Sequence, residues 1–212
     1  MSALSELNQS IYSCRKCEIS ALRTKAVPGE GAENAEIMFV GEAPGWHEDQ
    51  QGRPFVGAAG QFLNELLESI GLTREQVFIT NIVKTRPPDN RDPSPQELAN
   101  CAPFLEKQIA IIKPKIIVTL GRYSMAKFRP GKSIGEIHGT AVRRDGVLYF
   151  AMYHPAAALH QGNLRSVIKA DMMKIPELFA KFKKELEYEC AMAQVKKSEK
   201  PQDGQQLNLG LG

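Results

Sequence analysis

The sequence has 212 residues, of which 42% are hydrophobic and 24% charged, and its formal net charge is +3. This length supports one sizeable core and is short for two. The net charge is too small to establish a polyanionic partner, because affinity for nucleic acid depends on where cationic groups cluster. No apolar stretch approaches the ~18 residues needed to cross a bilayer, and no leader pattern opens the chain. We therefore predict a soluble, intracellular protein.

Four short apolar runs predict strands at residues 35–41, 77–83, 115–121 and 148–154. Their nearly continuous apolar character is typical of strands covered by helices on both faces. Helical spacing follows the first three runs, and the second helix is expected to begin at Ser94 as N-cap with Pro95 in its first turn. The alternation predicts a three-layer α/β/α sandwich around a central four-stranded parallel sheet with right-handed crossovers.

A helical pattern returns over residues 164–189 and is interrupted by Pro176. We predict a single domain over residues 1–190. Residues 191–212 are polar and lack aromatic side chains, so we expect a disordered tail there. Within it, Gln206, Leu209 and Leu211 weakly resemble a peptide that binds a sliding clamp, although the aromatic residues of such peptides are missing.

Polar residues gather where the predicted strands end. The first strand ends in GEAPGWHEDQQGRPFVG, the second in Thr80 and Asn81, and the last in Tyr153 and His154. In open parallel sheets, ligands bind in the crevice beyond the carboxyl ends of the strands. The sequence therefore predicts a site for a small polar ligand at this edge.

Each of these residues also has a purely structural interpretation. Glu42 and Glu48 could be solvated loop acids, Phe55 a core residue and His154 a strand cap. Asn81 fits such an interpretation less well, because a buried amide must find partners for its donors and its acceptor. The GEAPG turn alone is a weak signal, since it matches neither the dinucleotide fingerprint nor the phosphate-binding P-loop.

Several motifs in order resemble one known family. GEAPG with a following Glu-Asp and GRPFVG, Thr-Asn at a strand end, RPPDNRDP and YHPAA resemble the family 4 uracil-DNA glycosylases, the iron–sulfur type. The resemblance runs from about Cys14 to about Pro176. It implies the uracil-DNA glycosylase superfamily fold and hydrolysis of the N-glycosidic bond of deoxyuridine in DNA, without a lyase step. Such an enzyme must flip the base out of the stack.

The resemblance assigns a role to each residue at the strand ends. Asn81 would read the uracil edge, Phe55 would stack on the base, and the backbone of Glu42 and Ala43 would line another polar edge. His154 would stabilise the charge that develops on the departing base, and Glu48 would position the attacking water or stabilise the sugar cation. Asp49 is the alternative to Glu48. The catalytic residues are then His154, Glu48 and Asn81.

The same resemblance suggests how DNA is held. Lys84, Arg86 and Arg91 would contact phosphates, which fixes register without reading sequence. Leu159 would act as an apolar wedge that fills the vacated stack.

The cysteines match the family pattern with one departure. The resemblance implies a [4Fe–4S] cluster held by four cysteines, of which Cys14, Cys17 and Cys101 are present, but Thr85 stands at the third position. Three interpretations stay open: an engineered ligand substitution, a cluster with one non-cysteine ligand or three irons, or no cluster. We favour a cluster site with three cysteines. Zinc or a redox C-x-x-C pair are further alternatives, and Cys190 is expected to be a free thiol.

Two other functions compete with repair. One is a non-catalytic or covalently trapping relative that binds uracil in DNA, but the branch that cross-links carries a histidine in an insertion that KTRPPDNRDPSP lacks. The other is a flavodoxin-like nucleotide-binding enzyme, for which the phosphate loop is missing. The expected partner is uracil-containing DNA, with no membrane contact. We expect a monomer in the cytoplasm of a prokaryote.

Overall fold

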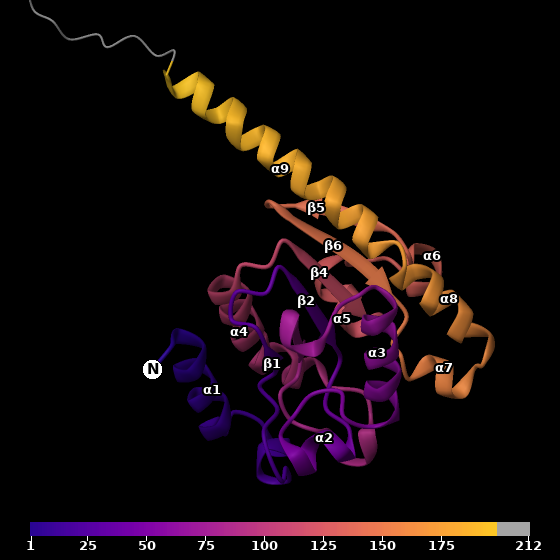
Figure 1. The fold of residues 1–212 in the computed structure, drawn as a ribbon. Coiled ribbons are helices and arrows are strands. Elements are labelled where there is room, and N and C mark those ends of the chain that lie inside the picture. Colours follow the sequence, from indigo (N-terminus) through magenta and orange to yellow (C-terminus); the bar gives the residue numbers. More distant parts are fainter. Residues whose placement is uncertain (199–212) are drawn as a thin grey trace, which may run out of the picture. The chain divides into compact units, whose positions relative to one another are not determined.

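The computed structural model describes residues 1–198, and the side chains of residues 1–192. Their contacts divide the chain after Ile175. Residues 1–175 form one compact unit that contains the whole sheet, and helix α9 makes up nearly all of the described part of the second unit (Figure 1). No helix among the described residues is long and apolar enough to cross a membrane.

Six strands form one mixed sheet in the order β1-β3-β2-β4-β6-β5. The central four pair in parallel, as predicted, whereas the edge strands β1 and β5 pair antiparallel with their neighbours. The strands are β1 (Glu30–Gly31), β2 (Ile37–Gly41), β3 (Phe78–Asn81), β4 (Ile116–Leu120), β5 (Ala141–Arg144) and β6 (Val147–Met152). The predicted fold class is confirmed, and two short edge strands are added to it.

The two edge strands were missed because neither is a continuous apolar run. Strand β1 has two residues, and three of the four residues of β5 are exposed. A turn signal does precede β6: Asp145 and Gly146 both have positive φ (51° and 75°), the pattern of a tight Asp-Gly hairpin. An edge hairpin needs only one covered face, so apolar continuity does not detect it.

Helices cover both faces of the sheet (Figure 1). Helices α1 and α4 pack together on one face, with α5 against the central strands, and α3 packs with α8 on the other. The helices are α1 (Ala3–Ser13), α2 (Trp46–Gln51), α3 (Ala58–Ser69), α4 (Pro95–Ile112), α5 (Arg122–Phe128), α6 (Ile134–Ile137), α7 (Ala157–His160), α8 (Asn163–Met172) and α9 (Ile175–Ser198), with 3₁₀ turns η1 (Glu18–Ala21), η2 (Arg74–Gln76) and η3 (Pro88–Asn90).

The predicted start of α4 is confirmed. The Ser94 hydroxyl accepts a hydrogen bond from the backbone N–H of Glu97 (3.2 Å), and the Glu97 carboxylate accepts one from the Ser94 backbone N–H (2.8 Å). This reciprocal pair satisfies two otherwise unpaired donors at the helix start. The predicted break near Pro176 is also present, between α8 and α9. Helix α9 continues past residue 190 to Ser198, and the candidate clamp residues Gln206, Leu209 and Leu211 lie outside the described residues.

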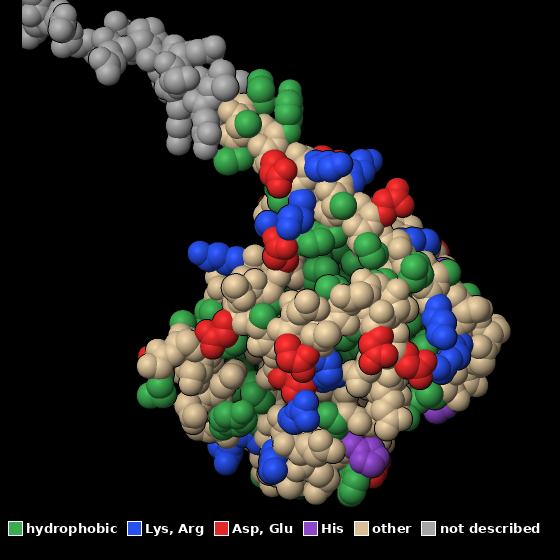
Figure 2. All heavy atoms as spheres, in the orientation of Figure 1, with side chains coloured by type: hydrophobic (Ala, Val, Ile, Leu, Met, Phe, Trp, Pro, Cys, Tyr) green, Lys and Arg blue, Asp and Glu red, His purple; other side chains and the backbone are tan. Residues whose placement is uncertain are grey.

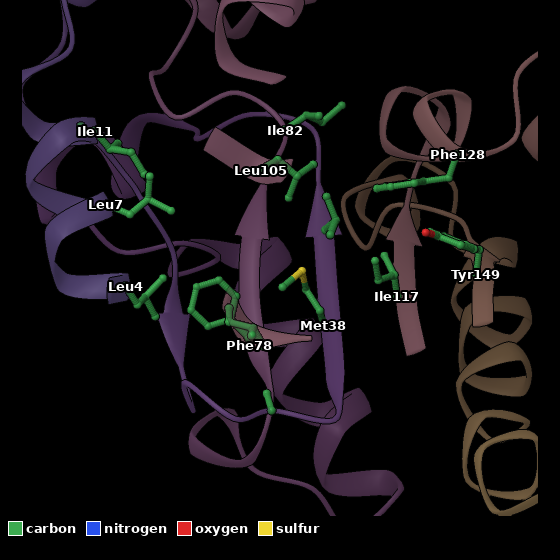
Figure 3. Packing of buried hydrophobic residues seen from close by; sticks show 14 residues of the cluster. Leu4, Leu7, Ile11, Met38, Phe78, Ile82, Leu105, Ile117, Phe128 and Tyr149 are labelled. Atoms are coloured by element: carbon green, nitrogen blue, oxygen red, sulfur yellow. The ribbon is translucent and has the colours of Figure 1, made fainter. Parts of the chain in front are cut away.

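The packing of helix α1 against the core fixes the position of the N-terminal segment. Leu4, Leu7 and Ile11 follow a helical spacing and are buried against the cluster that includes Phe78 and Leu105 (Figure 3). Burial of such side chains stabilises by about 1.5–3 kcal/mol each. The packing of α1 fixes the position of its C-cap, Cys14, close to helix α4 and therefore to Cys101.

Candidate active site

A cavity of about 390 Å³ opens beyond the carboxyl ends of the central strands. It has the size of a site for a small ligand. Seven predicted residues line it, namely Glu42, Ala43, Glu48, Phe55, Asn81, Arg91 and His154. Seven more lining residues were not predicted: Pro44, Gly45, Ala59, Pro87, Asn90, Ala156 and His160.

Asn81 ends strand β3, and only 1% of its surface is exposed. Its Oδ1 atom is buried and has no hydrogen-bond partner. An unpaired buried acceptor costs about 1–3 kcal/mol, so a folded protein retains one where something else supplies the donor. The cavity wall therefore presents an acceptor that is ready for a ligand N–H.

Gly41, directly opposite Asn81 on β2, makes room for this arrangement. A Cβ at Gly41 would lie 2.3 Å from Asn81 Oδ1 and 2.5 Å from the ring of Phe55. Both distances are far below a van der Waals contact. The glycine therefore lets the amide and the aromatic ring meet at the same wall of the cavity.

The backbone of Phe55 is held in an unusual conformation. Its φ is +52°, a region that non-glycine residues seldom adopt. Arg74 donates hydrogen bonds to the carbonyls of Phe55 (3.1 Å) and Pro54 (2.6 Å), and Gly60 of α3 lies so close that a Cβ there would be 1.8 Å from the Phe55 carbonyl oxygen. Such strain persists where surrounding contacts over-determine it, which is common at binding sites.

His154 lies at the cavity wall after β6. Its Nδ1 accepts a hydrogen bond from the backbone N–H of Ala156 (3.1 Å), and its ring stacks on that of Phe55 at 5.5 Å between centroids. Burial lowers the pKa of His154 to about 4, while the nearby Glu48 carboxylate opposes this weakly. The imidazole is therefore neutral at pH 7. Because Nδ1 is an acceptor, we assign the proton to Nε2, which makes that nitrogen a donor.

Glu48 is fixed by three backbone donors. Its Oε1 accepts from Val56 (2.8 Å) and Gly57 (2.9 Å), and its Oε2 accepts from Gly45 (3.1 Å). A carboxylate has about four lone-pair sites, so roughly one acceptor position remains. Asp49, the predicted alternative, is 4% exposed and accepts from the Thr24 backbone N–H instead. Glu48, and not Asp49, lines the cavity.

The Glu42 carboxyl titrates near neutrality. Burial raises its pKa most, repulsion by Asp92 adds to this, Arg122 counteracts it, and together they give a pKa of about 7. Arg122 is itself hydrogen-bonded to Asp92. One wall of the cavity therefore gains negative charge as pH rises through about 7.

The structure corrects one predicted DNA contact. Lys84 is 2% exposed, and its Nζ donates to Thr80 Oγ1 (2.6 Å), the Asn81 carbonyl (2.7 Å) and Gln108 Oε1 (2.7 Å). Three acceptors match the three donors of an ammonium group. Burial lowers the pKa of Lys84 to about 7. The side chain cannot reach a phosphate, because it ties the end of β3 to helix α4.

The other predicted DNA contacts are accessible. Arg86 donates to Asn90 Oδ1 (2.7 Å), and Arg91, whose side chain is 46% exposed, pairs with both oxygens of Glu97. Leu159 in α7 is 48% exposed, an unusual exposure for a leucine, and its neighbour His160 lines the cavity. Figure 2 shows basic and acidic side chains interspersed on the face in view.

The four cysteine-motif positions meet at a second, very small cavity. Cys14, Cys17, Cys101 and Thr85 all line it, together with the apolar side chains Ile11, Ile19 and Phe104. Convergence of these positions agrees with the family pattern. The donor set does not fit a four-cysteine cluster, because Thr85 supplies a hydroxyl where the pattern has a thiol.

The sequence carried some signal for the residues that were missed. Pro44 and Gly45 belong to the GEAPG turn, and Pro87 and Asn90 to RPPDNRDP, so both motifs reach the cavity as whole loops. His160 follows the candidate wedge Leu159 by one residue. The role of Arg74 left no pattern in the sequence, since it acts on backbone carbonyls 19 and 20 residues away.

The sequence also matches known proteins. Residues 28–187 match the profile of the uracil DNA glycosylase superfamily. The chain is 50% identical to a type-4 uracil-DNA glycosylase of Sulfurisphaera tokodaii (84% of this chain, 86% of the relative) and 47% identical to that of Archaeoglobus fulgidus (85% and 96%). It is 33% identical to a type-5 enzyme of Pyrobaculum aerophilum, over 62% of this chain and 66% of that one.

Proposed function

We propose that this chain, which belongs to the type-4 uracil-DNA glycosylases, hydrolyses the N-glycosidic bond of deoxyuridine in DNA, releasing uracil and leaving an abasic site. The observation that carries the proposal is the unpaired, buried Oδ1 of Asn81 in the cavity wall. The activity requires base flipping, because C1′ of a stacked nucleotide is inaccessible.

Recognition of the base would rest on Asn81 and Phe55. The Asn81 amide would accept a hydrogen bond from uracil N3–H and donate one to O4, whereas cytosine presents the opposite pattern at these two atoms. A mismatched buried edge costs on the order of 1–3 kcal/mol. The ring of Phe55 would stack on the base, and the backbone of Glu42 and Ala43 would line another polar edge.

His154 and Glu48 would act on the bond itself. As the C1′–N1 bond breaks, its electron pair leaves with uracil, and the Nε2–H of neutral His154 would donate to O2 of the resulting anion. A donor aimed at developing charge in a dry site contributes roughly 3–4 kcal/mol. Glu48 would use its remaining acceptor position to hold the attacking water. That water supplies the hydroxyl left on C1′ and the proton that uracil finally takes up.

Residues at the rim of the cavity would hold the DNA. Arg86 and Arg91 would contact phosphates, and Leu159 would enter the stack where the uracil has left. The enzyme would act as a monomer on DNA in the cytoplasm of a prokaryotic cell.

The test is incubation with a uracil-containing oligonucleotide, followed by alkaline cleavage at abasic sites. We expect strand cleavage for the wild type, its near absence for Asn81→Ala, and normal cleavage for Asn34→Ala, an exposed asparagine away from the cavity. No cleavage by the wild type, together with a stable protein–DNA adduct, would identify a trapping relative instead. Normal cleavage by Asn81→Ala would mean that Asn81 does not read the base.

A further inference from the structure

A third cavity, of about 560 Å³, lies next to the cysteine-motif positions. It shares Ser20 and Arg23 with the small cavity that those positions line, here called the cysteine cavity. Three of its lining side chains are cationic, namely Arg15, Arg23 and Lys25, and none carries a carboxylate, so we call it the basic cavity. Within the described part of the chain, none of the three cations forms an ion pair. The basic cavity therefore gathers positive charge that no carboxylate pairs with there.

Two of the cations are held side by side. Arg15 Nη1 donates hydrogen bonds to the carbonyls of Cys14 (2.9 Å) and Tyr12 (3.3 Å), and Arg23 Nη2 donates to the same two carbonyls (3.0 and 2.6 Å). Both acceptors are neutral, so they fix the guanidinium groups without cancelling their charge. Burial lowers the pKa of Arg23 and the charge of Arg15 lowers it further, while nearby thiols and Asp49 oppose this. An anion between the two guanidinium groups would relieve their repulsion.

Several donors of these cations stay available for a ligand. Arg15 uses only Nη1 in the contacts above, and a guanidinium carries five N–H donors. The Lys25 ammonium has no hydrogen-bond partner among the described residues, and its stem passes over Gly52, where a Cβ would lie 3.3 Å from Lys25 Cδ. Arg23 is the most fixed of the three, because its Nη1 also donates to Thr85 Oγ1 (3.0 Å). Guanidinium and ammonium donors both suit phosphate oxygens, so the ligand that fits the basic cavity is a phosphate group.

The basic cavity is linked to the cavity beyond the strand ends through shared residues. An intermediate cavity of about 170 Å³ shares Arg23 with the basic cavity and Pro87 with the cavity beyond the strand ends. Arg86, a proposed phosphate contact, lines this intermediate cavity, together with the acids Asp49 and Asp89. A strand whose flipped base enters the cavity beyond the strand ends therefore has a continuous path past Arg86 to the basic cavity.

We propose that the basic cavity binds a backbone phosphate of the uracil-containing strand, outside the nucleotide that is flipped. The proposal rests on the proposed function for the identity of the strand. Arg15 and Lys25 contact the phosphate, and Arg23 holds Arg15 in place through the shared carbonyls while adding its own charge. Such a contact raises the affinity for DNA and sets its register without reading sequence.

The experiment measures DNA binding without turnover. The duplex carries 2′-fluoro-2′-deoxyuridine, whose glycosidic bond resists hydrolysis because the fluorine disfavours positive charge on the sugar. Fluorescence anisotropy compares the wild type with Arg15→Gln, Lys25→Gln, the double variant and Lys16→Gln. Lys16 is the matched control, because it is exposed, follows Arg15 directly and does not line the basic cavity.

We expect each single variant at Arg15 or Lys25 to bind several-fold more weakly than the wild type. In the double variant, the slope of log K against log salt concentration should become shallower by about 0.9, the contribution of one phosphate contact. Lys16→Gln removes the same unit of charge and should keep the affinity and the slope of the wild type.

A second measurement locates the phosphate on the strand. Each backbone phosphate in turn is replaced by an uncharged methylphosphonate, and Kd is measured relative to the unmodified duplex. The wild type should show a loss of affinity at a position away from the uracil, and that loss should vanish in the double variant. Because each protein is compared with itself, a difference in the folded fraction does not affect the result.

Three outcomes would overturn the proposal. One is equal affinity and salt slope in all variants, and another is the same methylphosphonate profile in the wild type and the double variant. The third is loss of inorganic phosphate binding in calorimetry by the double variant with unchanged DNA affinity, which would make this a site for a free anion.

Uracil release from a deoxyuridine duplex is measured separately on the wild type. A wild type that releases no uracil but shows the methylphosphonate loss would support the phosphate site and overturn the proposed function. Normal release, together with unchanged DNA affinity in the double variant, would overturn the phosphate site alone.

Discussion

The cavity beyond the strand ends, here called the pocket, and the cysteine cavity both take residues from one segment, 81–101, and they differ in completeness. In the pocket, Asn81, Phe55 and His154 already face a shared space with a free acceptor. In the cysteine cavity, one of four expected thiols is replaced by the hydroxyl of Thr85. The residues that line the pocket come from strand ends and the loops that follow them, and none of the cysteine-motif positions is among them.

Lys84 connects the two regions. Its side chain bonds to the carbonyl of Asn81, and it also lines the cysteine cavity. If the regions are independent, substitutions in one region should leave the other unchanged, and Lys84 should be the exception.

The largest expected effect is the loss of uracil release when His154, which lines the pocket, is substituted. His154→Ala should lower the rate of uracil release about 10²–10³-fold under single-turnover conditions, since it removes a donor to the developing anion. The melting temperature and the iron content should stay as in the wild type. His47→Ala, an exposed histidine that does not line the pocket, is the matched control. A change of less than tenfold would remove His154 from the proposed mechanism.

Substitution of Lys84, which contacts both regions, should lower the stability of the fold. Lys84→Met leaves three buried acceptors without their donor, so the free energy of unfolding should fall by about 2–3 kcal/mol in urea denaturation. Lys107→Met, at an exposed position on helix α4, should change it by less than about 0.5 kcal/mol. Equal effects for both variants would contradict the buried network, and unchanged uracil release by Lys84→Met would separate the two regions.

Leu159, at the rim of the cavity, should contribute less to the rate of uracil release than the residues that line the pocket. Leu159→Ala should reduce kcat/KM on double-stranded uracil DNA by roughly tenfold and on single-stranded DNA by less, because only a duplex has a stacked gap to fill. Met173→Ala removes an apolar side chain of similar exposure outside the pocket and should have no effect. An equal loss on both substrates would argue against a wedge.

The smallest effect concerns pH. Because the pKa of Glu42 is raised to about 7, the carboxyl becomes charged as pH rises through that value and opposes the negative charge on departing uracil. We expect kcat/KM to fall several-fold above pH 7, and Glu42→Gln to flatten the profile. His154 does not account for such a step, since its pKa is about 4. An unchanged step in Glu42→Gln would assign it to another group.

Much of the fold was readable because its central strands are buried on both faces. Continuous apolar runs marked β2, β3, β4 and β6, and the Ser94 cap marked α4. The six residues predicted at the strand ends could be placed together since parallel strands end at one edge, and Arg91, predicted as a phosphate contact, also lines the cavity. Lys84 was misplaced because a lysine in a loop-like sequence is usually solvated, and burial is decided by neighbours distant in the chain.

By itself, the sequence determined the layered α/β fold, the edge of the sheet where a ligand would bind, and the position where the cysteine pattern breaks. Local periodicity and the order of motifs carry that information. The tertiary structure alone decided that Asn81 Oδ1 lacks a partner, that Lys84 is enclosed by Thr80 and Gln108, and that Arg23 lies against Thr85. These facts depend on contacts between segments up to 62 residues apart, which no local pattern encodes.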